Sequence, residues 1–192
     1  GYNVAKGSAD ALNGSTKNPN NSDLEYKNAY DQAADGFNGA NNTAPENQTA
    51  SYKAGQKAKS DSQDGANLAT TGQSLPANPS QAEKDGYNAA KDAYDVATGK
   101  KTAPDLTNKS LAYQDAYKKA IAVANPVVSN ALADYKNGSI ANKPADDNSA
   151  AGQAYNAVKD DAAAGANAAI PPNSSDTPAS DKTPAYKEGY NI

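Results

Sequence analysis

The 192-residue chain contains no cysteine, histidine, arginine, methionine or tryptophan. Without cysteine and histidine it has neither a thiol nucleophile nor a side chain whose ordinary pKa lies near neutrality. The usual zinc ligands are missing as well. These absences argue against an enzyme, and we expect no catalytic residues, no metal site and no cofactor.

Large aliphatic side chains are also scarce, with 7 Leu, 4 Ile and 6 Val beside a single Phe. Such a fraction is usual in disordered chains, but the net charge of −4 is too small to keep the chain unfolded by repulsion. We therefore expect a fold that packs through alanine and the twelve tyrosines. The dispersed lysines and the slight negative charge argue against nucleic acid as a partner, and no apolar run is long enough for membrane insertion.

A short phrase recurs along the chain: Tyr, two variable residues, a small residue, then a second Tyr. Counted at its last position, it falls at residues 2, 30, 56, 87, 117, 155 and 190, so that the repeat is 26–38 residues long. The copies at 56, 87 and 155 are weaker, and the first of them has Gln56 in place of the second Tyr. The residue before that position is Gly or Ala in every copy. Tyrosines four residues apart lie on one face of a helix. The tyrosines assigned to these repeat positions are Tyr26, Tyr30, Tyr52, Tyr87, Tyr113, Tyr117, Tyr155, Tyr186 and Tyr190.

Helix-starting residues precede the phrase in the same register. Three residues before its first position stand Asp23, Thr49, Ser80, Ser110, Asn148 and Thr183. Their side-chain oxygens suit the N-cap, where they accept a hydrogen bond from a free backbone N–H. A proline and an Asn or Asp lie shortly before each of them, which ends the preceding helix and favours a turn.

The spacing predicts an all-α fold: an elongated array over residues 1–192 with one short helix in each repeat. Helices are expected near 1–13, 23–40, 49–70, 80–98, 110–136, 148–169 and from 183 onward, joined by Pro/Asn/Ser loops, with a kink or break at Pro126. Loops of about ten residues allow successive helices to run either antiparallel or parallel, and we expect the commoner up-down order. The chain starts and ends at the same point of the repeat, as expected of a segment cut from a longer tandem array.

The small residue before the second aromatic position should allow neighbouring helices to approach closely. In the five inner copies of the phrase it is Ala29, Gly55, Gly86, Ala116 or Ala154. Glycine costs about 0.5–1 kcal/mol relative to alanine inside a helix, so that close packing explains its use. Two interpretations of the tyrosines remain open: packing between helices, or an exposed platform that stacks on a sugar or contacts a partner.

The combination of Pro, Asn-x-Ser/Thr and Tyr-x-x-Gly-Tyr-x-x-Ala in an Ala-, Asn- and Lys-rich chain resembles the adhesin-type repeat regions of cell-wall-linked surface proteins. Such proteins occur in lactobacilli and related Gram-positive bacteria. The resemblance implies a secreted, extracellular protein that is attached to the cell wall through regions outside this segment. It carries no binding residues over to this chain.

The sequence therefore predicts a stalk or spacer that projects another domain from the cell wall, with neighbouring repeats of the same chain as its partners. The alternative is an adhesive module that binds a host glycan or surface protein through exposed tyrosine and loop residues. The exposure of the tyrosines separates the two hypotheses. A spacer should bury most of them, whereas an adhesive module should display several together.

Overall fold

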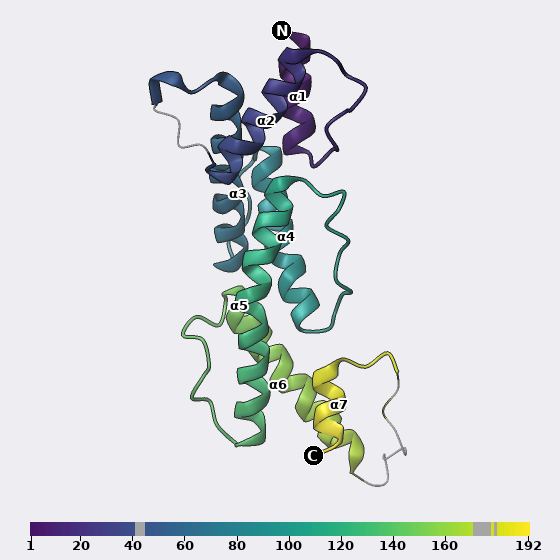
Figure 1. Ribbon diagram of the computed structural model, residues 1–192. Coiled ribbons are helices and arrows are strands. Elements are labelled where there is room, and N and C mark those ends of the chain that lie inside the picture. The colour runs from purple at the N-terminus through teal and green to yellow at the C-terminus, as the bar shows by residue number, and fades with distance from the viewer. Residues whose placement is uncertain (41–44, 171–177, 179) are drawn as a thin grey trace. The chain divides into compact units, whose positions relative to one another are not determined.

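The computed structural model describes all residues except 41–44, 171–177 and 179. The described residues form helices and connecting segments, without a β-strand (Figure 1). In chain order the elements are α1 (Tyr2–Leu12), α2 (Leu24–Asn38), the 3-10 helix η1 (Pro45–Asn47), α3 (Ala50–Thr70), α4 (Gln81–Ala97), α5 (Leu111–Lys136), α6 (Ala150–Ala169) and α7 (Pro184–Tyr190). The all-α class predicted from the sequence is confirmed for this part of the chain.

Side-chain caps begin most of the helices. The backbone N–H three residues further on donates to the side chain, over 3.1–3.2 Å, at Asp23, Thr49, Ser80, Ser110 and Thr183. The cap of α6 is Ser149 rather than Asn148, which corrects the sequence prediction. The reason is a turn at Asp146, whose side chain accepts a hydrogen bond from the Asn148 N–H and so delays the helix by one residue.

Glycines end the first five helices. Each lies one or two residues beyond its helix and has a positive φ between 62° and 79°: Gly14, Gly39, Gly72, Gly99 and Gly138. A glycine in this left-handed conformation lets the chain leave the helix while its N–H still satisfies one of the last carbonyl groups. In α2, α3, α4 and α5 the side-chain cap and the terminating glycine together fix both ends of the helix in the sequence, whereas α1 begins at Gly1 without a side-chain cap.

Helix α5 continues through Pro126, so the predicted break is not found. Proline at this position removes one intrahelical hydrogen bond, which would otherwise reach the carbonyl of Ala122. Ala122, Asn125 and Pro126 are all exposed, and the Ala122 carbonyl is therefore free to bind water. An exposed turn is where a helix tolerates the loss most easily.

The chain divides into two compact units, and the boundaries fall inside helices. The first unit comprises residues 1–68, 75–89 and 104–117, and the second comprises residues 69–74, 90–103 and 118–192. Alanine and tyrosine dominate the buried apolar residues of the first unit, which include Tyr26, Ala33, Phe37, Tyr52, Ala89 and Tyr113. The second unit has one cluster of Ala131, Tyr155, Val158 and Ala185 and another of Tyr94, Ala124 and Ala154.

Consecutive helices run in the same direction in the pairs α1/α2 and α6/α7 (Figure 1). The start of α2 lies beside the start of α1, where Asn3 Nδ2 donates to Asp23 Oδ2 over 2.6 Å. An up-down pair would instead place Asp23 beside the end of α1, so the expected up-down packing is not confirmed. The connecting loop makes the parallel order possible, because about ten residues can span ~33 Å whereas an 11-residue helix is ~16 Å long.

Candidate functional site: a repeated helix junction

Consecutive helices touch each other backbone to backbone, at glycines. A Cβ atom added to Gly36 of α2 would lie 2.1 Å from the carbonyl oxygen of Tyr52 in α3. One added to Gly55 of α3 would lie 2.1 Å from the carbonyl oxygen of Ala33 in α2. Real Cβ atoms essentially never come within 3.0 Å of another residue's atoms, so any side chain would force the two helices apart. The contact instead brings Cα–H groups against carbonyl oxygens.

The contact is reciprocal, because each glycine meets the carbonyl three residues before the small residue of its partner helix. The added Cβ would lie 1.8–2.3 Å from the carbonyl oxygen in every case: Gly7–Tyr26, Gly65–Glu83, Gly86–Ser62, Gly165–Tyr186 and Gly189–Ala162. In α2/α3, α3/α4 and α6/α7 both helices contribute a glycine, so exchanging the two helices of a pair maps one contact onto the other, whereas in α1/α2 only Gly7 makes this contact. The same junction therefore recurs in α1/α2, α2/α3, α3/α4 and α6/α7.

The second half of each junction was predicted from the sequence, and the first half was not. The small residues expected to face a neighbour are all buried: Ala29, Gly55, Gly86, Ala116 and Ala154. On the preceding helix the counterparts of Ala29, Gly55 and Gly86 are Gly7, Gly36 and Gly65, and the counterpart of Gly189 is Gly165. These glycines occupy no fixed position relative to the tyrosine phrase, and for that reason the repeat alignment did not reveal them.

A hydrogen bond also joins the cap of one helix to a polar side chain of the helix before it; a hydroxyl cap donates this bond, whereas in α1/α2 Asn3 Nδ2 donates to the carboxylate of the cap Asp23. Thr49 Oγ1 donates to Gln32 Oε1 over 2.5 Å, and Ser110 Oγ donates to Asp85 Oδ2 over 2.6 Å. Thr183 Oγ1 likewise donates to Asp161 Oδ2 over 3.0 Å. The cap hydroxyl thus accepts a hydrogen bond from a backbone N–H of its own helix and donates a hydrogen bond to a side chain of the preceding helix. We call this pairing the cap bridge.

The polar partner of the cap bridge always lies four residues before the small residue of the same helix. The five pairs of polar partner and small residue are Asn3/Gly7, Gln32/Gly36, Asp61/Gly65, Asp85/Ala89 and Asp161/Gly165. In the same order, their polar partners form hydrogen bonds with the caps Asp23, Thr49, Ser80, Ser110 and Thr183 of the next helix. In each receiving helix the small residue lies six positions after the cap. The junction is therefore encoded by two short patterns: polar-x3-small on the first helix and cap-x5-small on the second.

The cap bridge between α4 and α5 allows a direct measurement of its strength. Ser110→Ala removes the N-cap acceptor and should lower the free energy of unfolding by about 1 kcal/mol, as N-cap removals do. Asp85→Ala removes only the partner. Because the two groups interact, the double variant should cost about 0.5–1 kcal/mol less than the sum of the single ones. Urea unfolding of the four proteins tests this, and strict additivity would show that the bridge contributes nothing.

The α5/α6 pair uses a different junction, built around a buried carboxylate. Asp134 of α5 is only 2% exposed and accepts hydrogen bonds from Tyr155 Oη, over 2.5 Å, and from the backbone and side-chain nitrogens of Asn142, over 2.8 and 2.9 Å. The hydrogen bond from Tyr155 is the main cause that lowers the pKa of Asp134. Burial, followed by the same hydrogen bond, raises the pKa of Tyr155 to about 12. The cluster fixes the loop after α5 to both helices.

The tyrosines mostly lie inside these junctions. Tyr26, Tyr52, Tyr113, Tyr117 and Tyr155 of the predicted positions are buried, and Tyr30, Tyr87, Tyr186 and Tyr190 are partly buried. Tyr2 is the exception among all twelve, because its side chain is 79% exposed. No cluster of exposed tyrosines is found among the described residues.

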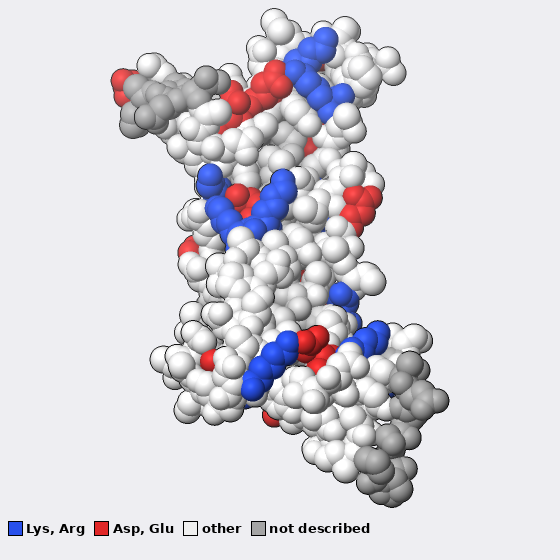
Figure 2. Space-filling model, turned by 60° about the horizontal axis from the view of Figure 1, so that its bottom comes forward, with Lys and Arg blue, Asp and Glu red and all other residues white. Residues whose placement is uncertain are grey.

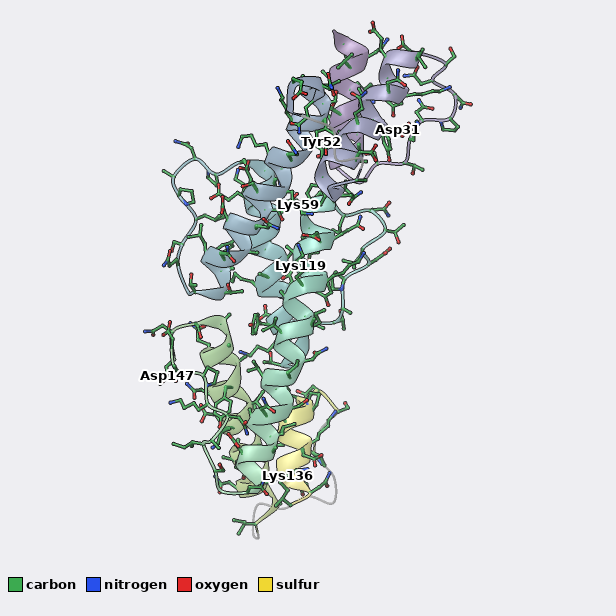
Figure 3. All side chains as sticks on the ribbon, turned by 60° about the vertical axis from the view of Figure 1, so that its left-hand side comes forward. Asp31, Tyr52, Lys59, Lys119, Lys136 and Asp147 are labelled. Atoms are coloured by element: carbon green, nitrogen blue, oxygen red, sulfur yellow. The ribbon has the colours of Figure 1, made fainter. Side chains whose placement is uncertain are left out.

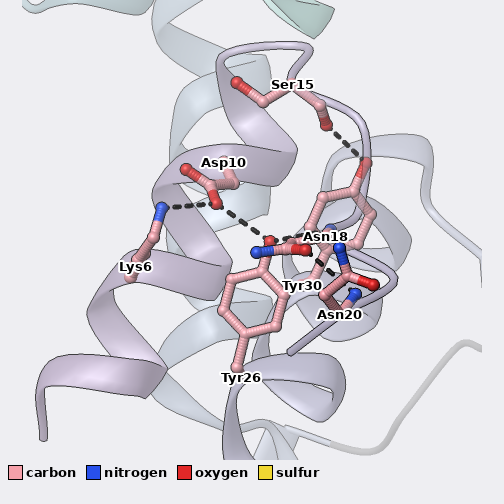
Figure 4. Close-up of polar contacts among 7 residues, drawn as sticks. All are labelled: Lys6, Asp10, Ser15, Asn18, Asn20, Tyr26 and Tyr30. Atoms are coloured by element: carbon pink, nitrogen blue, oxygen red, sulfur yellow. Dashed lines mark hydrogen bonds and ion pairs between the residues drawn. The ribbon is translucent and has the colours of Figure 1, made fainter. Parts of the chain in front are cut away.

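The hydroxyl groups of two tyrosines bind the α1/α2 loop to the helices (Figure 4). Tyr26 is fully buried, and its hydroxyl donates to Asp10 over 2.9 Å and accepts from the Asn18 N–H over 3.2 Å. Lys6 pairs with the same carboxylate over 2.9 Å, and its hydrogen bond is the main cause that lowers the pKa of Asp10. The Tyr30 hydroxyl donates to the carbonyl of exposed Ser15 over 2.8 Å.

These two hydroxyls should differ in their contribution to stability. Tyr26→Phe leaves the buried end of the ring without its two hydrogen bonds and should lower the free energy of unfolding by about 1–2 kcal/mol. Tyr30→Phe removes a hydrogen bond at an exposed carbonyl, which water replaces, and should change it by less than about 0.5 kcal/mol. Thermal unfolding of both variants provides the comparison. Equal losses would contradict the role assigned to the Tyr26 network.

Charged side chains on the surface are paired locally. Lysines and acidic residues are interspersed on the face shown in Figure 2, without a wide field of one sign. Lys136 of α5 pairs with Glu188 of α7, and Asp147 pairs with Lys143 over 2.9 Å (Figure 3). Of the adjacent acids 160 and 161, the second serves a cap bridge. Asp147 and Asp161 thus each have a structural partner.

A groove of about 300 Å³ lies in the first unit. Its apolar lining includes Leu12, Phe37 and several alanines. Four of its polar side chains are already paired, Lys57 with Asp61 and Ser110 with Asp85. The groove thus offers small apolar contacts but few free polar groups to orient a ligand.

The described residues contain no group of three or more acidic side chains placed to hold a metal ion. Within the same residues, none of the helices has the length and apolar character that crossing a bilayer requires. A search of family models, of curated proteins and of solved structures found no match to the chain.

Proposed function

We propose that the chain is a structural spacer: a stalk segment of an extracellular bacterial surface protein that projects another domain from the cell wall. The observation that carries the proposal is the junction repeated in α1/α2, α2/α3, α3/α4 and α6/α7. In each of these pairs the glycine contact joins consecutive helices, and additional contacts such as Ser8–Ser51 and Ser62–Ala112 join helices that are two apart. A fold stabilised by such contacts between nearby helices is lengthened by adding repeats, without redesign of a central core.

The burial of the tyrosines supports the spacer over the adhesive alternative. Eleven of the twelve are at least partly covered, and six of them are buried. Aromatic rings that stack on a sugar must be accessible, and Tyr2 alone meets that condition. A surface of paired charges and short polar loops is suited to a spacer segment, which must provide length and remain soluble. The location at the cell wall rests on the sequence resemblance.

The experiment is to display a reporter domain from a wall anchor on zero, one or two copies of the chain. The reach of the reporter is measured as its binding to antibody fixed on beads, which cannot enter the outer wall layer. Binding should increase with each copy. A spacer of equal length made from an unrelated helical repeat should substitute for the chain, because the proposed function requires no specific contact.

Binding of the purified chain to mucin or host-cell glycans provides the opposing measurement. Saturable binding that is lost in Tyr2→Ala would favour the adhesive module and overturn the spacer. Tyr30→Phe is the control for Tyr2→Ala, because it changes another tyrosine near the start of the chain but keeps the ring and removes only the hydroxyl that binds Ser15.

A further inference from the structure

Three helices of the structure end at the dipeptide Asn-Gly: Asn13-Gly14 at α1, Asn38-Gly39 at α2 and Asn137-Gly138 at α5. The glycine is needed at these places, because each has a positive φ. The asparagine is not needed for the turn, since α3 and α4 end in the same conformation at Thr71-Gly72 and Thr98-Gly99. All three asparagines are exposed. Their amide groups therefore have a chemistry that the helix ends do not require.

An asparagine before a glycine can react with its own backbone. The glycine nitrogen bonds to the side-chain carbon Cγ of the asparagine, the bond from Cγ to the amide nitrogen breaks, and that nitrogen leaves as ammonia with the proton of the glycine nitrogen. Water then opens the resulting five-membered succinimide ring at either carbonyl group, which yields aspartate or isoaspartate. Glycine favours the first step because it has no Cβ beside the attacking nitrogen. The reaction consumes water and needs no oxidant or reductant.

The fold surrounds the three glycines differently. A Cβ added at Gly14 would lie 2.0 Å from the carbonyl oxygen of Lys109, so the end of α1 is packed against the backbone just before α5. The carbonyl group of the next residue, Ser15, is held by the Tyr30 hydroxyl over 2.8 Å. At Gly39 and Gly138, by contrast, an added Cβ would meet no other segment of the described residues within 4 Å. Closure of the succinimide ring rotates the backbone at the glycine, and Lys109 blocks that rotation at Gly14 alone.

We propose that Asn38 and Asn137 are sites of spontaneous deamidation, whereas packing protects Asn13. The attacking nitrogens belong to Gly39, whose N–H donates to the carbonyl of Asp35, and to Gly138, whose N–H donates to that of Tyr135 over 3.2 Å. Both hydrogen bonds lie in the last turn of an exposed helix end, where local opening costs little free energy and frees the nitrogen. The inference concerns a chemical modification and is independent of the spacer function.

Modification of Asn137 extends to the buried carboxylate of α5. In isoaspartate the peptide bond runs through the side-chain carbon, so the backbone between residues 137 and 138 is longer by one carbon atom. The added atom lies inside the turn in which the Ser139 N–H donates to the carbonyl of Asp134 over 2.8 Å. In the same loop the Asn142 N–H donates to the Asp134 carboxylate over 2.8 Å. Isoaspartate at residue 137 should therefore move Asn142 away from Asp134 and loosen the loop after α5.

Ageing of the full chain at mildly alkaline pH tests the sites, because the attacking nitrogen must lose its proton. Mass spectrometry of peptides locates each deamidated residue by the mass change from an amide to a carboxyl group. In the folded protein Asn38 and Asn137 should convert at least ~10-fold faster than Asn13. In protein unfolded by urea the three rates should be similar, since each asparagine precedes glycine. A folded protein in which Asn13 reacts as fast as the other two, or in which Asn38 or Asn137 stays unmodified, would overturn the proposal.

The effect on the α5/α6 junction is measured on the aged protein, after the form with isoaspartate at residue 137 has been separated by chromatography. Backbone amide exchange of Asn142 should be at least ~10-fold faster in that form than in fresh protein. Asn137→Thr is the matched control, because threonine precedes the terminal glycine of α3 and α4, and its exchange should not change with age. Asn137→Asp carries the new charge on a normal backbone and should resemble the fresh parent. Exchange in the isoaspartate form no faster than in Asn137→Asp would overturn the loosening of the junction.

Discussion

Gly86→Ala should lower the free energy of unfolding by about 3 kcal/mol, although alanine has the higher helix propensity. Alanine is favoured over glycine by about 0.5–1 kcal/mol in a helix interior, so propensity alone predicts stabilisation. The added Cβ, however, would lie 2.0 Å from the Ser62 carbonyl oxygen and 2.7 Å from its carbon. Both are backbone atoms, and no rotamer change relieves the overlap. Helices α3 and α4 would have to separate, and they would lose their packing along the junction.

A matched control lies two residues away, at exposed Asn88 of the same helix. Asn88→Ala changes propensity in the same helix without adding atoms at the junction, and it should be neutral or stabilising by a few tenths of a kcal/mol. Urea unfolding followed by circular dichroism measures both. A Gly86→Ala protein as stable as Asn88→Ala would show that the helices do not cross at this glycine.

The helix limits could be predicted from the sequence because they are fixed by local chemistry. A cap needs an oxygen at one position, and Thr49 or Ser80 supplies it whatever the rest of the fold does. Pro184 at the first position of α7 acts equally locally. Asn148 was misplaced by one residue because the side chain of Asp146, two positions earlier, competes for the same backbone.

The direction of the helices could not be predicted, because it depends on which residues meet across a junction. A ten-residue loop is long enough for either order. The decisive residues are Gly36 and Gln32, whose role appears only when Gly55 and Thr49 lie opposite them. Taken alone, Gln32 is one more polar residue on a helix. The pattern becomes visible only once several junctions are compared in space.

The different junction between α5 and α6 could not be predicted from the sequence either. Asp134 belongs to no repeat position, and a single Asp near the end of a long helix predicts a solvated surface. Its burial follows from Asn142 in the next loop and Tyr155 in the next helix, eight and twenty-one residues away. Only the fold brings these three side chains together.

Asp134→Ala should be the most damaging single substitution, with a loss of about 4 kcal/mol in the free energy of unfolding. It removes the acceptor for three donors: the Tyr155 hydroxyl and both nitrogens of Asn142. Tyr155 is only 1% exposed, so water cannot replace its partner. Asp147→Ala is the matched control, because that carboxylate is exposed and pairs with Lys143 at the surface. It should change stability by less than about 1 kcal/mol.

Asp134→Asn separates the charge from the hydrogen bonds and predicts how stability depends on pH. The Asn142 side-chain amide can turn over to present its oxygen, so that all three hydrogen bonds persist, and the loss at pH 7 should be only about 1 kcal/mol. The folded pKa of Asp134 lies below its ordinary value of about 3.9. Its contribution is therefore complete above that value and is lost as the pH falls through the folded pKa. Tyr155, with a pKa raised from 10.0 to about 12, contributes stability that is complete below pH 10 and lost as the pH rises toward 12.

Unfolding by urea between pH 2 and 11.5 tests both contributions. The parent protein should lose stability at both ends of this range, and Asp134→Asn should lose less stability than the parent at acid pH. In Tyr155→Phe the part of the alkaline loss that comes from Tyr155 should be missing. If Asp134→Asn follows the parent curve at low pH, the carboxylate is not the group that is titrating.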